Sequence, residues 1–469
     1  MFDNQKRPRF LLELPSEILC AIVQAGFVSA FGTTTPGEAG AYPPHPLYPP
    51  REYYRPAITT LYNLCFVSRR LRDAALPVLY REFAVGYGDH DGQPSRFGSL
   101  EGRLAEFFHT LIRRRDLAAL VRHAFLDPRL LTLMSQEEML RVISEASRVL
   151  GTPESASLAS KARDGTLHCG NEACVTFLAF ALMPNLEHMA LPASAWLGGS
   201  VTPAWPRLKS LEFIDDCKQM RLHPDSYPRP HSPVVTLTLH GAAPPDMSHL
   251  APMLPHVVNI RLVRTRLELS GVESLIGAKG FSGLQSFHYI LELASRPFYN
   301  QIISLLSRYH ADTLRHLTIE TQHGWYSDDS EGTVHTAAAQ SFRQFTKMES
   351  LVIDGFILAP RSPLPAKDLP NPETFYAALL PPSLKILRVI GTRQLVAEPA
   401  IFGLRESVAA GELPNLCEFW CTAHPLGRRP PRRTALHRRE AAIRQSFAQV
   451  GVYFRVFLPD SWVDYTNRW

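Results

Sequence analysis

The sequence has no long apolar run. Its longest, residues 175–183, still contains Thr176 and is far shorter than the ~20 residues that a membrane-spanning helix needs. The N-terminus also lacks the apolar segment behind basic residues that forms a signal peptide. We therefore expect neither a membrane anchor nor a membrane partner.

Cysteine is scarce, and charge of either sign is nearly balanced. Seven scattered cysteines, an odd number in 469 residues, do not form the framework of a disulfide-rich secreted protein. This pattern predicts a reducing compartment, cytoplasmic and/or nuclear. A net charge of only +5 does not require a nucleic-acid partner, and we expect none.

Motifs for catalysis or cofactor binding are missing as well. The sequence has no Gly-x-Ser-x-Gly elbow, no phosphate-binding loop and no dinucleotide fingerprint. Cys417, Cys421 and His424 are a possible metal set, but a repeat core should hold Cys421 and exclude Cys417. The cluster at 168–174 lacks the paired Cys-x2-Cys knuckles of a zinc site. We expect no enzyme activity, cofactor or metal.

The composition that remains is typical of a folded globular chain, with 45% hydrophobic and 20% charged residues. The 39 prolines indicate frequent breaks between short elements. One dense basic run, residues 428–433, is interpreted as a solvated loop before the last helix. A nuclear-import signal or a contact with an acidic partner is the alternative.

Two amphipathic stretches near the start predict short helices. In the first, Pro15 suits the opening position of a helix, where its missing N–H costs nothing. Its apolar stripe consists of Ile18, Leu19, Ile22 and Val23. The second stretch keeps a 3–4 spacing from Leu61 to Ala75, with charged residues opposite, and Pro77 is expected to stop it.

The order of residues in these stretches adds more than the stripes do. Leu-Pro-x-Glu-Ile-Leu starts at residue 14, Leu-x-x-Leu-x-x-Val-Ser-Arg-x-Leu-Arg at 61, and Leu-Pro-x-Leu-Tyr at 76. Together they resemble the F-box, the helical module by which substrate receptors dock on the Skp-type adaptor of SCF ubiquitin ligases. The resemblance implies binding to that adaptor and its cullin. The positions that match adaptor-facing or motif-defining residues are Leu14, Pro15, Ile18, Leu19, Val67, Ser68 and Leu71.

The resemblance gives residues 10–84 to the F-box-like unit, with an unusual proline-rich insertion at 30–56. We interpret the insertion as a surface loop. A peptide ligand for a proline-reading domain is the alternative. A Gly/Ser/Asp-rich linker at 85–102 should follow it, and residues 103–469 should form the second domain.

Internal repeats decide the architecture of that second domain. A six-residue phrase, apolar-x-x-apolar-x-apolar, recurs ten times, and from Leu186 onward its spacing is 22 to 36 residues. The copies occupy residues 121–126, 186–191, 208–213, 234–239, 257–262, 284–289, 314–319, 348–353, 384–389 and 416–421. Each phrase predicts one short parallel strand.

The phrases resemble degenerate leucine-rich repeats. The predicted fold class is therefore α/β, a helical F-box unit followed by an irregular leucine-rich-repeat-like solenoid with a curved parallel sheet. An ordinary α/β domain with a parallel sheet is the alternative. Return helices are expected at 297–309, 333–345, 371–380 and 401–410, a C-terminal helix and strand at 438–449 and 452–458, and a loop at 151–165.

In such strands the first, fourth and sixth residues of the phrase should face the core. The residues between them should line the opposite side, which we interpret as a surface for an unknown target protein. The candidate target-binding residues are His188, Glu212, His240, Arg261, His288, Asp354, Arg388 and Trp420. Arg261 and Arg388 would permit a phosphopeptide.

Two functions remain open. The chain is predicted to be a substrate-recognition subunit of an SCF-type ubiquitin ligase. The alternative is a repeat-based scaffold in which the F-box-like unit is only a structural cap. An enzyme has no motif in its favour.

Overall fold

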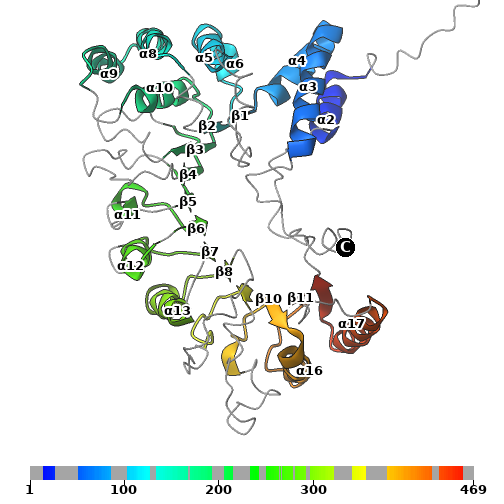
Figure 1. The fold of residues 1–469 in the computed structure, drawn as a ribbon. Coiled ribbons are helices and arrows are strands. Elements are labelled where there is room, and N and C mark those ends of the chain that lie inside the picture. The colour runs from blue at the N-terminus through cyan, green and yellow to red at the C-terminus, as the bar shows by residue number, and fades with distance from the viewer. Residues whose placement is uncertain are drawn as a thin grey trace, which may run out of the picture. The chain divides into compact units, whose positions relative to one another are not determined.

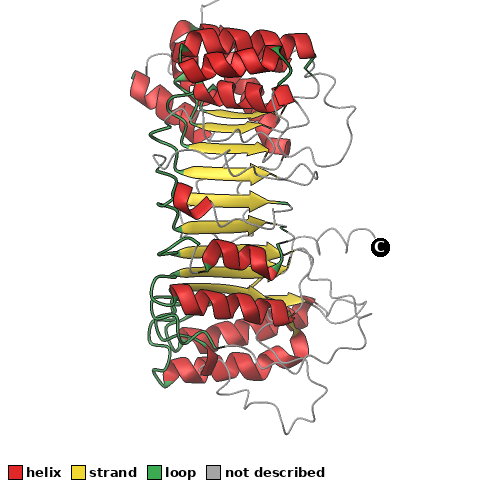
Figure 2. Cartoon of the chain, turned by 90° about the vertical axis from the view of Figure 1, so that its left-hand side faces the viewer, coloured by secondary structure: helices red, strands yellow, loops and turns green. Residues whose placement is uncertain are grey.

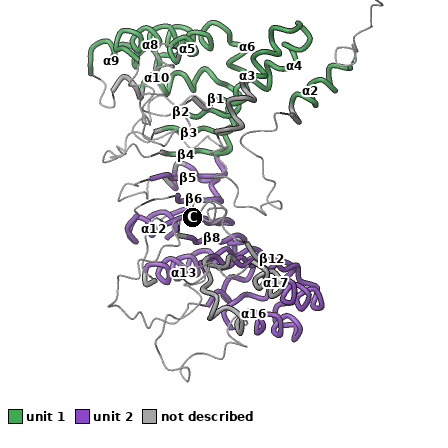
Figure 3. Tube along the Cα trace, turned by 45° about the vertical axis from the view of Figure 1, so that its right-hand side comes forward, with its two compact units in different colours: residues 1–216, 221–233 green, residues 217–220, 234–469 purple. Residues whose placement is uncertain are grey.

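The computed structural model divides the chain into two compact units. One contains Met1–Asp216 and Arg221–Pro233, and the other contains Cys217–Met220 and Val234–Trp469 (Figure 3). The structure describes residues 14–26, 51–85, 103–126, 134–166, 170–192, 205–214, 233–241, 250–263, 265, 267–277, 280–291, 296–321, 341–354, 378–424 and 433–457. The proposed linker residues 86–102 and the proline-rich residues 30–50 lie outside this description.

The described part of the first unit begins with three helices, α2 (Ser16–Gly26), α3 (Arg51–Val67) and α4 (Arg69–Leu79) (Figure 1). They share a small apolar core, because each contributes leucine, valine or alanine side chains from one face. The buried members of this core are Leu19, Val23, Leu61, Leu71, Ala74 and Ala75. Arg70 of α4 donates a hydrogen bond to the carbonyl of Leu14, which ties the start of α2 to α4.

The second amphipathic stretch forms two helices instead of the expected one. Ser68 adopts an extended conformation (φ −159°, ψ 158°), and its side chain accepts a hydrogen bond from the Leu71 N–H at 3.1 Å. This N-cap starts a new helix because it satisfies a donor that the first turn leaves free. Pro77 lies inside α4, two residues before its end, so it does not stop the helix as expected. In turn, α3 begins at Arg51 and includes the last six residues of the expected insertion.

The rest of the first unit alternates strands and helices. Its strands are β1 (Glu82–Val85), β2 (His123–Leu126), β3 (His188–Pro192) and β4 (Ser210–Ile214). They pair in sequence order, and every pairing is parallel. The helices are α5 (Arg103–Arg113), α6 (Arg115–Ala118), α8 (Gln136–Leu150), α9 (Pro153–Arg163) and α10 (Gly170–Ala181). The sheet thus starts at β1, directly after the N-terminal helices.

The prediction of a loop at 151–165 was wrong, because this segment contains α9. Its start signals are strong: Thr152 caps the helix by accepting from the Ser155 N–H at 3.1 Å, and Pro153 occupies the first turn. Leu158 and Ala162 are buried. The small residues that suggested a loop are compatible with a helix once these two signals are present.

The second unit carries the longer series of repeats. Its strands are β5 (Thr236–His240), β6 (Asn259–Val263), β7 (Ser286–Leu291), β8 (His316–Thr321), β9 (Ser350–Asp354), β10 (Ile386–Arg393), β11 (Glu418–His424) and β12 (Tyr453–Phe457). They too pair in sequence order and in parallel. Figure 2 shows the strands of each unit running in one direction. The predicted parallel strand in each of the ten phrases is confirmed.

The described helices of the second unit are α11 (Leu250–Met253), α12 (Leu269–Ile276), α13 (Arg296–His310), α16 (Gln394–Ala409) and α17 (Arg433–Ala448). Figure 1 places α11, α12, α13 and α16 on the same side of the strands. The return helices expected at 297–309 and 401–410 and the C-terminal helix and strand are present. The helix expected at 333–345 is contradicted in its described part, since residues 341–345 are not helical and contain a turn at 343–344. Of the helix expected at 371–380, residues 378–379 are helical.

Burial follows the phrase as predicted. In the nine copies from Leu186 onward, the first, fourth and sixth residues are at most 5% exposed. Alternation within each strand sends these side chains to the helix-covered side and the intervening ones to the other side. We call that other side the open face of each unit.

The Pro-Asn-Leu that precedes two of the phrases has a structural reason. Asn185 donates through Nδ2 to the Ala119 carbonyl at 2.7 Å, and Asn415 does the same to the Pro382 carbonyl at 3.0 Å. Each acceptor lies two residues before the phrase of the preceding repeat. An asparagine before the strand therefore satisfies a turn carbonyl of the neighbouring repeat, which links successive turns.

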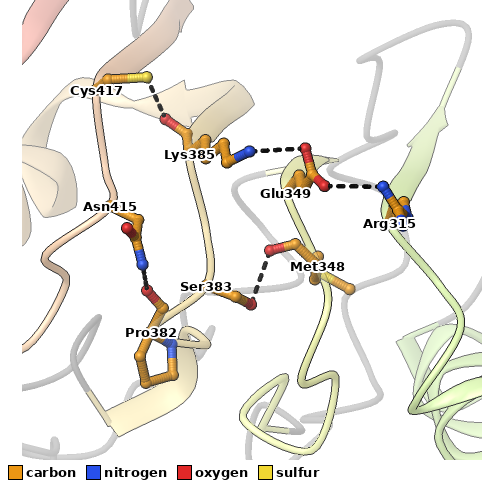
Figure 4. Close-up of polar contacts among 8 residues, drawn as sticks. All are labelled: Arg315, Met348, Glu349, Pro382, Ser383, Lys385, Asn415 and Cys417. Carbon is orange, nitrogen blue, oxygen red and sulfur yellow. Dashed lines mark hydrogen bonds and ion pairs between the residues drawn. The ribbon is translucent and has the colours of Figure 1, made fainter.

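A second ladder joins the phrases at their second residue. In the second unit, Glu349 accepts from Arg315 at 3.4 Å and from Lys385 at 3.0 Å (Figure 4). In the first unit, Glu187 accepts from Arg122 at 2.6 Å and from Lys209 at 3.0 Å. Partial burial raises the pKa of Glu187, but the two hydrogen bonds outweigh it and lower the pKa to about 2. Both carboxylates are thus ionised at neutral pH and join three consecutive repeats.

A buried histidine links two return helices through a hydrogen bond. His310, at the end of α13, is 2% exposed and donates from Nε2 to the carbonyl of Ile276, at the end of α12, at 2.8 Å. Burial lowers the pKa of His310, and the hydrogen bond to Ile276 opposes this effect only in part. The folded state therefore keeps this imidazole neutral.

Acidification should consequently destabilise the protein through His310. An unfolded histidine binds a proton below about pH 6.5, whereas the folded His310 resists protonation, so stability is complete above that pH and falls below it. We expect the melting temperature to drop between pH 7 and pH 5, and His310→Gln to reduce this drop, since glutamine can still donate to Ile276. The exposed His256→Gln is the control in differential scanning fluorimetry. An equal drop in both variants would contradict the assignment.

Candidate functional site

The first candidate surface lies on the N-terminal helices. Large apolar side chains remain exposed there although the three helices have filled their own core: Phe66 is 71% exposed, Val67 65% and Ile18 46%. We call Ile18, Ile22, Tyr62, Phe66 and Val67 the N-terminal apolar set. Exposed apolar side chains of this size on one small helical unit are typical of a protein-binding surface.

The structure separates the seven adaptor-binding candidates by their environment. Pro15, Ile18 and Val67 are exposed, and Leu14 is half-buried. Leu19 and Leu71 are 1% and 4% exposed, so they hold the helices together and are not available for contact. Ser68 caps α4. The sequence motif thus contains both exposed positions and positions that maintain the helical core.

Two members of the apolar set, Tyr62 and Phe66, had no role in the sequence prediction. They lie one turn apart on α3, and their rings meet edge to face at 4.9 Å between centroids. The sequence did contain a signal for their exposure, because both residues fall between the apolar positions of the stripe that begins at Leu61. An apolar residue outside the stripe is the sequence feature that could have identified them.

The second candidate surface is the open face of the first unit. His123 and His188 are in register on β2 and β3, with ring centroids 4.6 Å apart, and His123 Nδ1 lies 3.5 Å from Glu82 Oε1. Desolvation and the neighbouring His123 lower the pKa of His188 to about 4. His188 is therefore a neutral imidazole at physiological pH, and part of the residue reaches solvent. Glu212, expected on this surface, is 3% exposed, so the structure corrects its assignment to the solvent side.

The third candidate surface is the open face of the second unit. Its central feature is a row of in-register side chains across the strands, which we call the arginine row. The row consists of Thr238, Arg261, His288, Thr318, Val352, Arg388, Trp420 and Arg455. Four of the predicted target-binding residues thus come together on one line, and no residue of the row is acidic.

Acidic side chains and a further histidine lie beside the arginine row. His288 Nε2 is 3.2 Å from Glu320 Oε1, and both side chains are largely covered. Burial lowers the pKa of His288, and Glu320 opposes this effect. Asp354 is 3% exposed, so it is not the solvent-facing contact that the sequence predicted, while His240 is half-buried at the end of β5.

One end of the row forms a compact group, which we call the Arg–Trp–Arg cluster: Arg388, Trp420 and Arg455. The guanidinium carbon of Arg388 lies 4.5 Å from the indole centroid and that of Arg455 5.4 Å. Trp420 donates from Nε1 to Glu418 Oε2 at 3.2 Å. Trp420 is only 7% exposed, so it orients the arginines and is not itself the open anchor that the sequence predicted.

Metal and membrane sites do not emerge from the described ranges. Within them no group of three or more His, Cys, Asp and Glu side chains could hold a metal ion. Cys421 is buried and Cys417 exposed, as the phrase predicts. None of the described helices is long and apolar enough to span a bilayer.

Comparison with known proteins gives no family for this chain. Neither a protein-family model nor a curated protein matches it.

Proposed function

We propose that this chain is a substrate-recognition subunit of an SCF-type ubiquitin ligase. Its N-terminal helices would dock on a Skp-type adaptor, and through it on a cullin, while the repeats hold a target protein in the cytoplasm or nucleus. The chain would contribute proximity between the target and the ubiquitin-carrying partner, and no covalent chemistry of its own.

One observation carries the proposal. Ile18 and Val67, which the F-box resemblance assigns to the adaptor, are exposed on a three-helix unit, whereas Leu19 and Leu71 of the same motifs fill its core. A structural cap has no need of large apolar side chains in water, since burying them against a partner is what gains free energy. This division supports docking as the purpose of the unit.

The repeats support the second half of the proposal. Consecutive parallel strands present in-register side chains on the open face, the arrangement by which repeat proteins bind other proteins. The arginine row provides guanidinium groups, and arginine is one of the residue types most often found as a binding anchor.

A second function, a scaffold that serves no ligase, is favoured by the position of β1. The Arg81 carbonyl directly after α4 accepts from the N–H groups of Arg122 and His123, and β1 pairs with β2. The N-terminal helices are thus continuous with the first edge of the sheet, as a capping element would be.

Co-purification of the full chain with a recombinant Skp-type adaptor and cullin distinguishes the two functions. We expect a stable ternary complex on size-exclusion chromatography. Circular dichroism checks that the chain is folded. Recovery of the folded chain without the adaptor would contradict the ligase proposal and favour the scaffold.

A further inference from the structure

The open face of the second unit holds an arginine whose donors are not used. Arg388 Nε is buried and has no hydrogen-bond partner. Among the described residues none accepts a hydrogen bond from this guanidinium, and neither Glu320 nor Glu418 forms an ion pair with it. A buried donor without an acceptor is costly, so its retention calls for an explanation.

The surroundings hold this guanidinium in place. Trp420 lies under it at 4.5 Å, and β10 pairs with β9 on one side and β11 on the other, which fixes the strand that carries Arg388. A guanidinium held over a ring face can still donate from its terminal N–H groups. Two such groups match a carboxylate with two parallel hydrogen bonds.

We infer that the Arg–Trp–Arg cluster binds a carboxylate of a target peptide, an aspartate or glutamate side chain or a chain terminus, through Arg388. The inference rests on the proposed function, because the target-binding role explains why such a peptide would reach the cluster.

Charge decides between a carboxylate and a phosphate. Two arginines, Arg388 and Arg455, and two glutamates, Glu418 and Glu320, lie in or near the cluster, and Glu320 acts on Arg388 through space. A carboxylate adds only one negative charge to this set. A phosphoryl group carries nearly two at neutral pH and would be repelled by both glutamates.

The remaining residues of the row favour a peptide over a small anion. Tyr453 is 55% exposed, and its ring lies 6.4 Å from that of Trp420, at the edge of the cluster. Val352 is in register with Arg388 on the other side. Apolar groups on both sides of a guanidinium suit the neighbouring side chains of a bound chain.

A peptide array tests the inference with the full chain. The array carries peptides with randomised flanks around a fixed glutamate, glutamine, phosphoserine or serine, and a further set that ends in a free carboxylate. We expect glutamate or the free terminus to be preferred over glutamine by about tenfold or more, as a charge-assisted bidentate contact provides. No preference over glutamine, or preference for phosphoserine over glutamate, would overturn the inference.

Variants then connect the preference to Arg388. Arg388→Gln should abolish the preference for glutamate over glutamine. Arg388→Lys should retain only part of this preference, because lysine keeps the charge but lacks the planar guanidinium. Arg315→Gln is the matched control, since Arg315 lies on the Glu349 ladder and Lys385 remains to hold that carboxylate. An unchanged preference in Arg388→Gln, or an equal loss in Arg315→Gln, contradicts the assignment.

Two further measurements distinguish a binding role of Arg388 from a structural role, and the carboxylate site from the ligase proposal. The melting temperature of Arg388→Gln should not fall below that of the wild type, because the substitution removes an unsatisfied buried donor. A structural role predicts a clear decrease instead. Adaptor capture should be unchanged in every variant, so a failure of adaptor binding refutes the ligase proposal and a failure of the array refutes the carboxylate site.

Discussion

The double substitution Ile18→Asp with Val67→Asp is expected to abolish capture of the Skp-type adaptor, lowering affinity by about 100-fold or more, while the chain remains folded. Both side chains are largely exposed, so a charge at either position costs the free protein little. In a complex the same charges would be buried without partners. Each substitution should therefore reduce the binding free energy by as much as the loss of a binding hot spot does. Biolayer interferometry with immobilised adaptor measures the change.

The control for this experiment is Val235→Asp, which also places a charge at an exposed valine, but in the second unit. Its affinity for the adaptor should equal that of the wild type. Adaptor binding by the double variant at wild-type affinity would show that the N-terminal apolar set is not the docking surface.

Leu71→Asp should also lose the adaptor, for a different reason. Leu71 belongs to the core shared by α2, α3 and α4, so a charge there disrupts the helices. Circular dichroism should show loss of helix for Leu71→Asp and none for the exposed pair. The comparison separates contact residues from residues that only maintain the fold.

Much of the repeat architecture could be predicted because one physical signal is repeated. A strand with one buried face must place apolar residues at alternate positions, and a repeated phrase turns this weak local pattern into a strong one. Hence Leu237, Ile260 and Leu351, all fourth residues of their phrases, are buried as expected. The sequence also contained the start signals of α9, Thr152 and Pro153, but its small residues were given more weight.

The candidate sites were less predictable, since alternation says which face a side chain is on and not how deep it lies. Glu212, Asp354 and Trp420 are on the expected face but are covered by their neighbours. Arg388 and Trp420 hold the same position in their phrases, so the repeat predicts them as neighbours on β10 and β11. The phrase does not predict how close the guanidinium comes to the indole or how deeply the indole is buried. In the same way, the exposure of Phe66 follows from how α3 packs on α4.

Phe419→Ala is expected to cost about 3–5 kcal/mol of unfolding free energy, the range for a large aromatic removed from a packed core. Phe419 on β11 is 1% exposed and contacts Phe447 of α17 at 5.5 Å and Phe454 of β12 at 5.4 Å between ring centroids. The matched control is Phe402→Ala on α16, whose side chain is 46% exposed and should contribute little. Chemical denaturation measures both.

The effect of Phe419→Ala should be strongest at the C-terminal end, because each repeat is stabilised mainly by its neighbours. We expect hydrogen exchange to accelerate in α17 and β12, with β5–β8 protected as in the wild type. Since Arg455 lies on β12 and flanks Trp420, carboxylate-peptide binding should weaken along with this local loosening. Uniform loss of protection over the whole second unit would show instead that the repeats unfold as a single cooperative block.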